Sequence, residues 1–198
     1  EIPSAGNIRQ YVRAFNLANP LVDEQYHAAI DVAEAFPLNR RYRHVFLKAN
    51  LVNGIFRTAI RDVAGVAKHL YEKVENIDTR LRRGDPALVE DIAKYTKGGT
   101  TRRNYSFATK YCHCHQPGLF PIYDENVRIS LFGFNRHHGF AHFTRAGLRD
   151  YATFLAALEN FKMAFECTTI DNGTLDRFLW ALGRKVAAQK RRGNMGDA

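Results

Sequence analysis

Residues 95–127 read YTKGGTTRRNYSFATKYCHCHQPGLFPIYDENV, and the order of features in this stretch determines how the whole chain is interpreted. A basic turn with two glycines comes first, and the residues from about Phe107 to Gln116 predict a helix that stops at Pro117-Gly118. Asp124 follows the apolar run Phe120-Pro121-Ile122-Tyr123 and opens another predicted helix, which ends near residue 132. The stretch therefore predicts two helices, each preceded by a defined turn.

Helical spacing of apolar residues continues on both sides of this stretch and predicts an all-α fold. No internal repeat or linker divides the sequence, so we expect one helical domain over residues 1–198, built from one or two lobes. The other predicted helices are a segment with Ile8, Val12 and Phe15 that ends at Asn19-Pro20, residues 23–36, a segment that opens at Arg40, a long core helix over 52–73, a short helix over 88–93 capped by Asp85-Pro86, 146–165 and 174–189, with a loop at 135–144 and a frayed tail at 190–198.

The composition is basic, with 29 lysine and arginine residues against 20 acidic ones and a net charge of +9. Such a balance suits a polyanionic partner such as nucleic acid. No stretch approaches the roughly 20 apolar residues that span a bilayer, and we expect a cytoplasmic protein without a membrane partner. The three cysteines are an odd set, so reduced thiols are expected rather than a disulfide framework.

Residues from about 88 to 131 resemble the helix-hairpin-helix (HhH-GPD) DNA glycosylase superfamily, close to its 8-oxoguanine-glycosylase-like members and to an uncharacterised bacterial branch. In that superfamily the hairpin often reads Gly, apolar, Gly, variable, Lys, and the catalytic Asp opens a later helix after an apolar-Pro-apolar sequence. Ser106-Phe107-Ala108-Thr109-Lys110 fills the hairpin here, and Asp124 matches the catalytic position. The resemblance implies two helical lobes around a DNA-binding cleft. This chain departs from the pattern because both hairpin glycines are replaced.

The hairpin and the basic turn before it are expected to hold a DNA phosphate, because amides at a helix start carry partial positive charge. Contact with the phosphate backbone would position the protein without reading the sequence of bases. The alternative is that these charges form an ordinary solvated face. The expected DNA-binding residues are Lys97, Gly98, Gly99, Arg102, Arg103, Ser106, Ala108 and Thr109.

Two catalytic residues follow from the resemblance. Asp124 would stabilise the sugar cation that forms when a base leaves, and would help to orient water; its alternative role is a helix N-cap. Lys110 would attack C1′ as an amine and give abasic-site lyase activity, which requires a lowered pKa. The 14-residue interval between the two is shorter than expected for a lysine-bearing member, so a phosphate contact or a surface position for Lys110 stays open.

A flipped base needs an aromatic or apolar pocket, and most aromatic residues at helical spacing are instead core. The candidates are Trp180, Tyr123, His113 and Phe56. Cys112-His113-Cys114-His115 cannot easily surround one zinc ion, because four consecutive residues do not make a tetrahedron. Three cysteines are also too few for an iron–sulfur cluster. We therefore expect neither a metal nor a cofactor.

The function expected from this resemblance is excision of a modified or damaged base from double-stranded DNA by a monomeric enzyme, which leaves an abasic site. Base-excision repair and defence against phage with modified bases are both open. Two alternatives remain: a DNA-binding helix-hairpin-helix protein without catalysis, and a metal-dependent nuclease that uses the histidine- and cysteine-rich segments.

Overall fold

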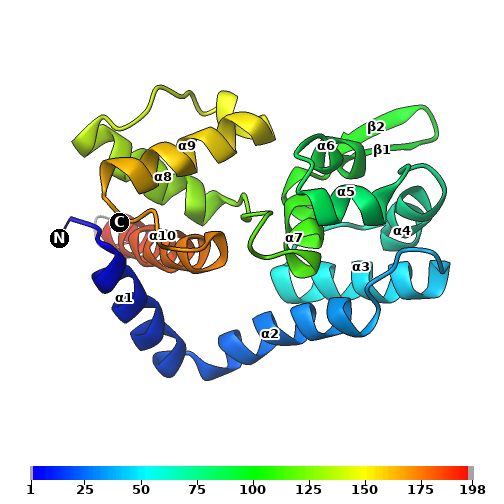
Figure 1. Cartoon of the computed structure of the whole chain (residues 1–198), viewed down its shortest axis with the longest axis horizontal. Coiled ribbons are helices and arrows are strands. Elements are labelled where there is room, and N and C mark those ends of the chain that lie inside the picture. Colours follow the sequence, from blue (N-terminus) through cyan, green and yellow to red (C-terminus); the bar gives the residue numbers. More distant parts are fainter. Residues whose placement is uncertain (1, 196–198) are drawn as a thin grey trace. The chain divides into compact units, whose positions relative to one another are not determined.

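A computed structural model describes the backbone of residues 2–195 and the side chains of residues 2–189. The described chain is mostly helical, with ten α-helices, one 3-10 helix and one two-stranded sheet (Figure 1). It divides into two compact units. Unit 1 contains Glu1–Ala18 and Tyr123–Ala198, and unit 2 contains Asn19–Ile122. In the described part of the chain, no helix has the length and apolar character that crossing a membrane requires.

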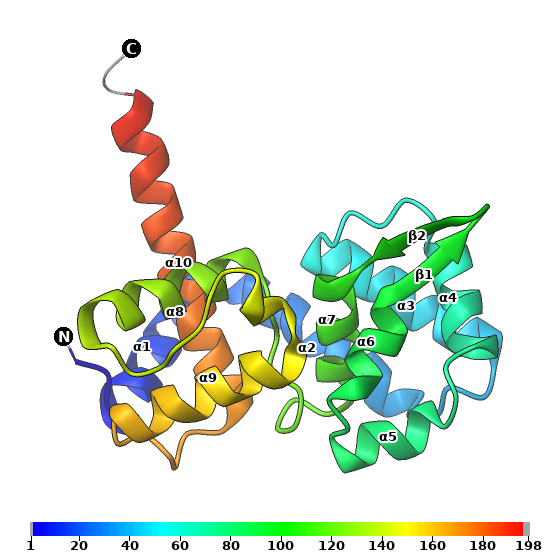
Figure 2. The same cartoon turned by 90° about the horizontal axis from the view of Figure 1, so that it is seen from above.

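Unit 1 is formed by α1 (Ala5–Ala18), α8 (Glu125–His138), the 3-10 helix η1 (Gly147–Arg149), α9 (Tyr151–Ala164) and α10 (Asn172–Met195). Helix α10 packs against both α8 and α1, as Figure 2 also shows. An aromatic cluster fills the core, because the ring of Phe134 lies 5.2, 5.6 and 6.2 Å from those of Phe161, Phe165 and Phe178. Burial of such rings is a main source of stability in a unit of this size.

The backbones of α8 and α10 approach each other closely at Gly183. A Cβ at this position would overlap the backbone carbonyl of Asn126, so only glycine fits. One turn further along α8, the buried Ser130 hydroxyl donates to the carbonyl of Leu179 at 2.6 Å. The contact therefore depends on a residue without a side chain and on one buried hydrogen bond.

Unit 2 is formed by α2 (Pro20–Ala35), α3 (Tyr42–Phe56), α4 (Val63–Glu72), α5 (Ile77–Arg83), α6 (Ala87–Ala93), β1 (Lys94–Lys97), β2 (Thr100–Arg103) and α7 (Tyr105–His115). Helix α7 packs against α6, α3 and α2. Nine of its eleven residues are buried, which makes it the central helix of the unit.

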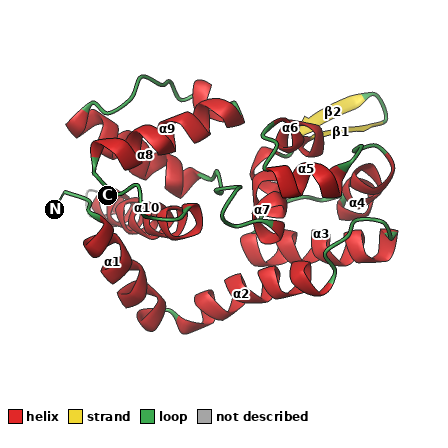
Figure 3. Ribbon diagram, in the orientation of Figure 1, coloured by secondary structure: helices red, strands yellow, loops and turns green. Residues whose placement is uncertain are grey.

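The two strands form a short antiparallel hairpin, drawn in yellow in Figure 3, in which Lys97 pairs with Thr100. Gly98 and Gly99 occupy the turn with φ of +56° and +76°. A two-residue hairpin turn with positive φ at both positions favours glycine, since a Cβ is strained there. The sequence predicted a basic turn with two glycines here, and the structure places that turn in a β-hairpin, which the sequence did not predict.

The predicted core helix over residues 52–73 is wrong, because α3 ends at Phe56 and α4 begins at Val63. Arg57 and Ala59 between them have φ of +50° and +59°, a left-handed conformation that no α-helix contains. Two side chains terminate the helices on either side. Asn53 Oδ1 accepts from the amide of Ile60 in the connecting loop at 3.0 Å. Asp62 caps α4 by accepting from the amide of Gly65 at 3.0 Å.

Other boundaries also differ from the prediction. The segment 146–165 is broken, because Asp150 caps α9 by accepting from the amide of Thr153 at 2.8 Å. The predicted loop at 135–144 begins later, since α8 continues to His138 and ends at Gly139, which has φ of +60°. The predicted frayed tail is helical to Met195, and its last three residues lie outside the described part.

Candidate functional site

Asp124 is the N-cap of α8, as its alternative role predicted. Its backbone is extended, with φ of −145° and ψ of 178°, and its Oδ1 accepts from the amides of Asn126 and Val127 at 2.9 and 3.0 Å. Such a cap stabilises a helix by about 1 kcal/mol. The side chain is partly exposed, so the carboxylate is not turned into the core.

Arginine residues surround the start of α8. Arg128 pairs with Glu125, and Arg145 lies 3.8 Å from the same carboxylate with 72% of its side chain exposed. Tyr123 is buried and meets the ring of Phe154 edge to face at 5.3 Å. Burial raises the pKa of Tyr123, while the positive charges of Arg128 and Arg149 oppose that rise. The positive field suits a negatively charged group at this end of the helix.

Lys110 is buried on α7, with 5% of its surface exposed, which excludes the surface position that the sequence left open. Its Nζ donates to the Ser106 hydroxyl at 2.8 Å and lies 5.9 Å from the centre of the Phe56 ring. Ser106 is one turn before Lys110 on the same face of the helix, which explains the contact. A primary amine thus lies beside an aromatic ring in the interior of unit 2.

His113 continues the same face of α7, and both of its ring nitrogens have partners. Nδ1 lies 2.8 Å from the carbonyl oxygen of Phe120, which can only accept, so Nδ1 carries the proton. Nε2 therefore accepts from the hydroxyl of Tyr26, 2.7 Å away. A histidine held at both nitrogens cannot bond to a base without losing one of these partners.

The structure brings two of the predicted pocket residues together in unit 2. The Tyr26 ring lies 6.5 Å from Phe56 and 5.6 Å from His113, so α2, α3 and α7 each contribute one ring to this cluster, and Phe56 is the ring that contacts Lys110. Sequence reasoning missed Tyr26. It lies 84 residues before Lys110, and no local pattern distinguishes it from other aromatic residues of the chain.

Trp180 and Tyr123 belong to unit 1. The ring of Trp180 meets Phe15 of α1 edge to face at 5.7 Å, and the Arg184 guanidinium lies over it at 5.5 Å. These contacts place the half-buried Trp180 at the junction of α1 and α10.

The hairpin motif that the resemblance assigned to residues 106–110 does not form a turn, because Ser106, Ala108 and Thr109 lie in the first two turns of α7, the helix that the sequence predicted from about Phe107. The amide of Ala108 bonds to the carbonyl of Asn104, and both Ala108 and Thr109 are completely buried. These two residues cannot present their amides to a phosphate. The replaced glycines explain the difference, since serine and alanine favour the helix while Gly98-Gly99 forms the turn.

Two of the predicted cations are paired within unit 2. Lys97 Nζ lies 2.7 Å from Asp62 Oδ2, and Arg103 pairs with Glu90 while its guanidinium lies 4.3 Å from the centre of the Tyr105 ring. The hydrogen bond from Lys97 lowers the pKa of Asp62 to about 2. Arg102 is exposed on β2, and no ion pair to it occurs among the described side chains.

The cysteine- and histidine-rich segment is interior. Burial raises the pKa of both thiols of α7, that of Cys114 to about 12, so they are weak nucleophiles and weak metal ligands near neutral pH. Burial likewise lowers the pKa of His115 to about 3. Among the described residues, no group of three or more histidine, cysteine or acidic side chains is suited to a metal ion.

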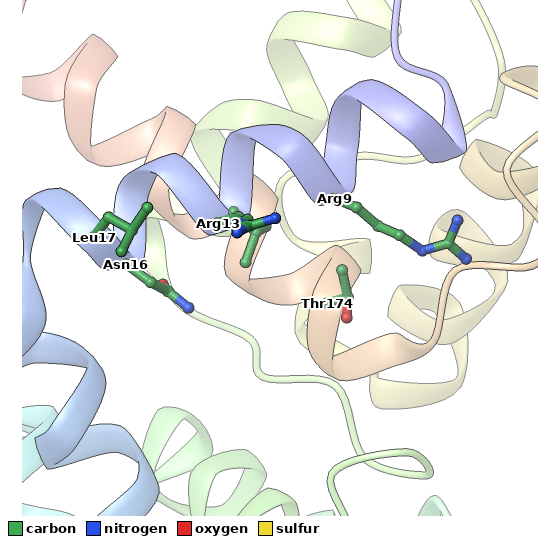
Figure 4. Close-up of a pocket in the computed structure, with 6 residues that line it drawn as sticks. Arg9, Arg13, Asn16, Leu17 and Thr174 are labelled. Carbon is green, nitrogen blue, oxygen red and sulfur yellow. The ribbon is translucent and has the colours of Figure 1, made fainter.

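A hollow of about 340 Å³ lies in unit 1 (Figure 4). Helix α1 lines it with Arg9, Arg13 and Asn16, and Thr174 comes from the first turn of α10. Arg9 already donates to the carbonyl of Thr169 at 3.1 Å. The lining residues include no acid or histidine that could transfer a proton near neutral pH, so this hollow is not the candidate catalytic site.

A protein of Haemophilus influenzae described as uncharacterized is 37% identical over 137 residues, which are 69% of this chain and 65% of that protein. The chain thus spans about two thirds of the length of its relative. No solved structure matches it. Residues 7–119 match a family described as the HI_0787 N-terminal domain, HI_0787_N, and this range includes Lys110 but ends before Asp124. Because the match covers more than half of the chain, the chain belongs to the HI_0787_N family.

Proposed function

We propose that this protein is a DNA glycosylase of the helix-hairpin-helix type, which removes a modified or damaged base from double-stranded DNA. The observation that carries the proposal is the burial of Lys110 between the Ser106 hydroxyl and the Phe56 ring. A lysine used as a nucleophile needs surroundings that favour its neutral form, and burial away from water acts in that direction.

The chemistry assigns a separate role to each candidate. The neutral Lys110 amine attacks C1′ of the flipped nucleotide, the N-glycosidic bond breaks, and the base leaves with the bonding electrons and takes up a proton. Loss of a proton from the new C1′–N bond and opening of the sugar ring give a Schiff base, which supports strand cleavage. In the other route water attacks, the Asp124 carboxylate stabilises the positive charge that develops on the sugar, and the product is an abasic site.

The aromatic residues near Lys110 suit the base itself. Phe56 and Tyr26 are half-buried aromatic side chains that meet edge to face in unit 2, and aromatic side chains are the type on which a flipped base stacks. The basic composition of the chain supports DNA as the polymer on which it acts. Repair of damaged DNA and attack on modified phage DNA both require this chemistry. The identity of the excised base distinguishes the two roles.

The decisive experiment incubates the protein with duplexes that carry oxidised, alkylated, deaminated or phage-type modified bases. Abasic sites are mapped, and covalent intermediates are trapped with borohydride. On the accepted substrate, Lys110→Gln should abolish trapping, and Asp124→Asn should slow base release on the order of 100-fold or more. Asparagine also caps helices, so the second variant keeps its fold.

The matched control for the lysine variant is Lys68→Gln, because Lys68 is an exposed lysine on α4 of the same unit. It should leave base release unchanged. Full activity of Asp124→Asn would contradict the assigned role of this carboxylate. Tight duplex binding without abasic sites on any substrate would favour a DNA-binding protein that lacks catalysis.

A further inference from the structure

A pocket of about 420 Å³ in unit 2 lies between the hairpin and the loop that joins α3 to α4. Arg61 and Asp62 line it from the loop. The hairpin contributes the remaining residues, which are Tyr95, Lys97, Thr100 and Arg102. Three of these six side chains are cationic and one is acidic, so the pocket carries excess positive charge.

The loop that presents Arg61 is held in one conformation by Asn53 of α3. Asn53 Oδ1 accepts from the Thr58 hydroxyl at 2.7 Å and from the amide of Ile60 at 3.0 Å, and Asn53 Nδ2 donates to the carbonyl of Ile60 at 3.1 Å. These bonds maintain the left-handed backbone at Ala59, which costs on the order of 1 kcal/mol. Arg61 directly follows Ile60, whose amide and carbonyl are both bonded to Asn53.

Part of the pocket lining is a hydrogen-bonded group centred on Asp62. The Tyr95 hydroxyl and Lys97 Nζ both donate to Asp62 Oδ2 at 2.7 Å. Gly65 makes room for this group, since a Cβ there would overlap the Tyr95 hydroxyl. The charge of the exposed Lys97 is therefore paired with that of Asp62, and the group joins the β-hairpin to the start of α4.

Arg61 and Arg102 remain as the cations that face a ligand, and no ion pair to either occurs among the described side chains. The Asp62 carboxylate repels an anion, so the favoured position is beside the guanidinium groups of Arg61 and Arg102. Arginine binds phosphate oxygens through paired N–H donors. Because the two arginines line an open surface pocket, a phosphate that is part of a polymer can bind there while its strand continues over the surface.

We propose that this pocket binds a backbone phosphate of DNA through Arg61 and Arg102, at a place separate from Lys110 and Asp124. The inference depends on the proposed function only in taking DNA as the polyanion. Both arginines contact the backbone and not the bases, so the contact is independent of sequence. It anchors unit 2 to the duplex. The β-hairpin formed by β1 and β2, which contains the basic turn expected to hold a phosphate, makes a contact that the buried Ala108 and Thr109 cannot make.

The test measures binding of an unmodified duplex by fluorescence anisotropy over a series of salt concentrations. Arg61→Gln and Arg102→Gln should each weaken binding about three- to tenfold and lower the slope of log Kd against log salt by about 0.9, as loss of one phosphate contact does. Arg83→Gln is the matched control, since Arg83 is exposed on α5 and lines no part of this pocket. It should behave like the wild-type protein.

Three results would overturn the inference. One is equal affinity and salt slope for the pocket variants and Arg83→Gln, and another is no binding of the duplex by the wild-type protein. In the third, inorganic phosphate at constant ionic strength binds the wild-type protein and not the variants, while their duplex affinity is unchanged, which would identify a site for free phosphate. Base release is scored separately on modified substrates, so the glycosylase proposal and this one can fail independently.

Discussion

His115 is a residue whose protonation differs strongly from that of an exposed histidine. Burial, assisted by the charge of Lys48, lowers the pKa of His115 from 6.5 to about 3, and no hydrogen-bond partner to its buried Nε2 occurs among the described residues. Between these two values the unfolded chain binds a proton that the folded chain does not. The contribution of the neutral His115 to the free energy of unfolding is therefore fully present above about pH 6.5, and it is lost as the pH falls toward 3.

We expect the free energy of unfolding in urea to fall by about 1 to 2 kcal/mol between pH 7 and pH 5 through this residue. His115→Leu should remove most of that fall, because leucine cannot be protonated. His142→Gln is the control, since His142 is exposed in the loop after α8. An unchanged pH dependence in His115→Leu would show that other groups cause it.

Individual site residues were predictable from sequence only where a local rule applies. Asp124 precedes a helix after a proline-containing segment, so its capping role could be derived from its position. The sequence identified Lys110, Phe56 and His113 as candidates. It could not predict that Phe56 lies near the other two, because Phe56 belongs to α3 and they belong to α7. Contacts over such separations depend on packing, which no local pattern records.

At the scale of elements, the loop between α3 and α4 offers a test of backbone strain. Ala59 has φ of +59°, a conformation that glycine adopts more easily than alanine. Ala59→Gly should therefore raise the free energy of unfolding, by up to about 1 kcal/mol. Ala64→Gly in the first turn of α4 is the matched control and should lower it by about 0.5 to 1 kcal/mol. A loss of stability in both variants would contradict the left-handed assignment.

The contact between α8 and α10 offers a second test. Gly183→Ala places a Cβ on the carbonyl of Asn126, so the two helices must separate. We expect unit 1 to lose about 2 kcal/mol or more of stability, measured by thermal unfolding. Gly133→Ala on α8 meets nothing within 4 Å and should leave stability equal or slightly higher. Equal effects of the two changes would argue against the close approach.

The hairpin and the interrupted helix show where sequence patterns are insufficient. All four residues of β2 are exposed, so the strand has no apolar alternation that could have predicted it. Residues 52–73 keep helical spacing on both sides of the break, and the interruption depends on the hydrogen bonds of Asn53 and Asp62. Side-chain bonds to the backbone compete with helical bonds in a way that apolar spacing does not record.

At the scale of the whole molecule, the net charge of +9 gives the broadest prediction. If about four phosphates are contacted, affinity for an unmodified duplex should fall roughly 100-fold between 50 and 200 mM salt. Anisotropy titrations at several salt concentrations measure this directly. An affinity independent of salt would exclude phosphate contacts as the main source of binding. The all-α class was predictable at this scale, because it depends on composition and periodicity rather than on single contacts.

The composition of unit 1 from two separate parts of the chain has a consequence for biosynthesis. Helix α1 packs on α10, and the whole of unit 2 lies between them in the sequence. On the ribosome, unit 2 can acquire its tertiary contacts as soon as its continuous stretch has emerged. Helix α1 cannot make its contacts with α10 until α10 has been translated. Until then, α10 does not cover the face of α1 that packs on it, and chaperones can bind this face.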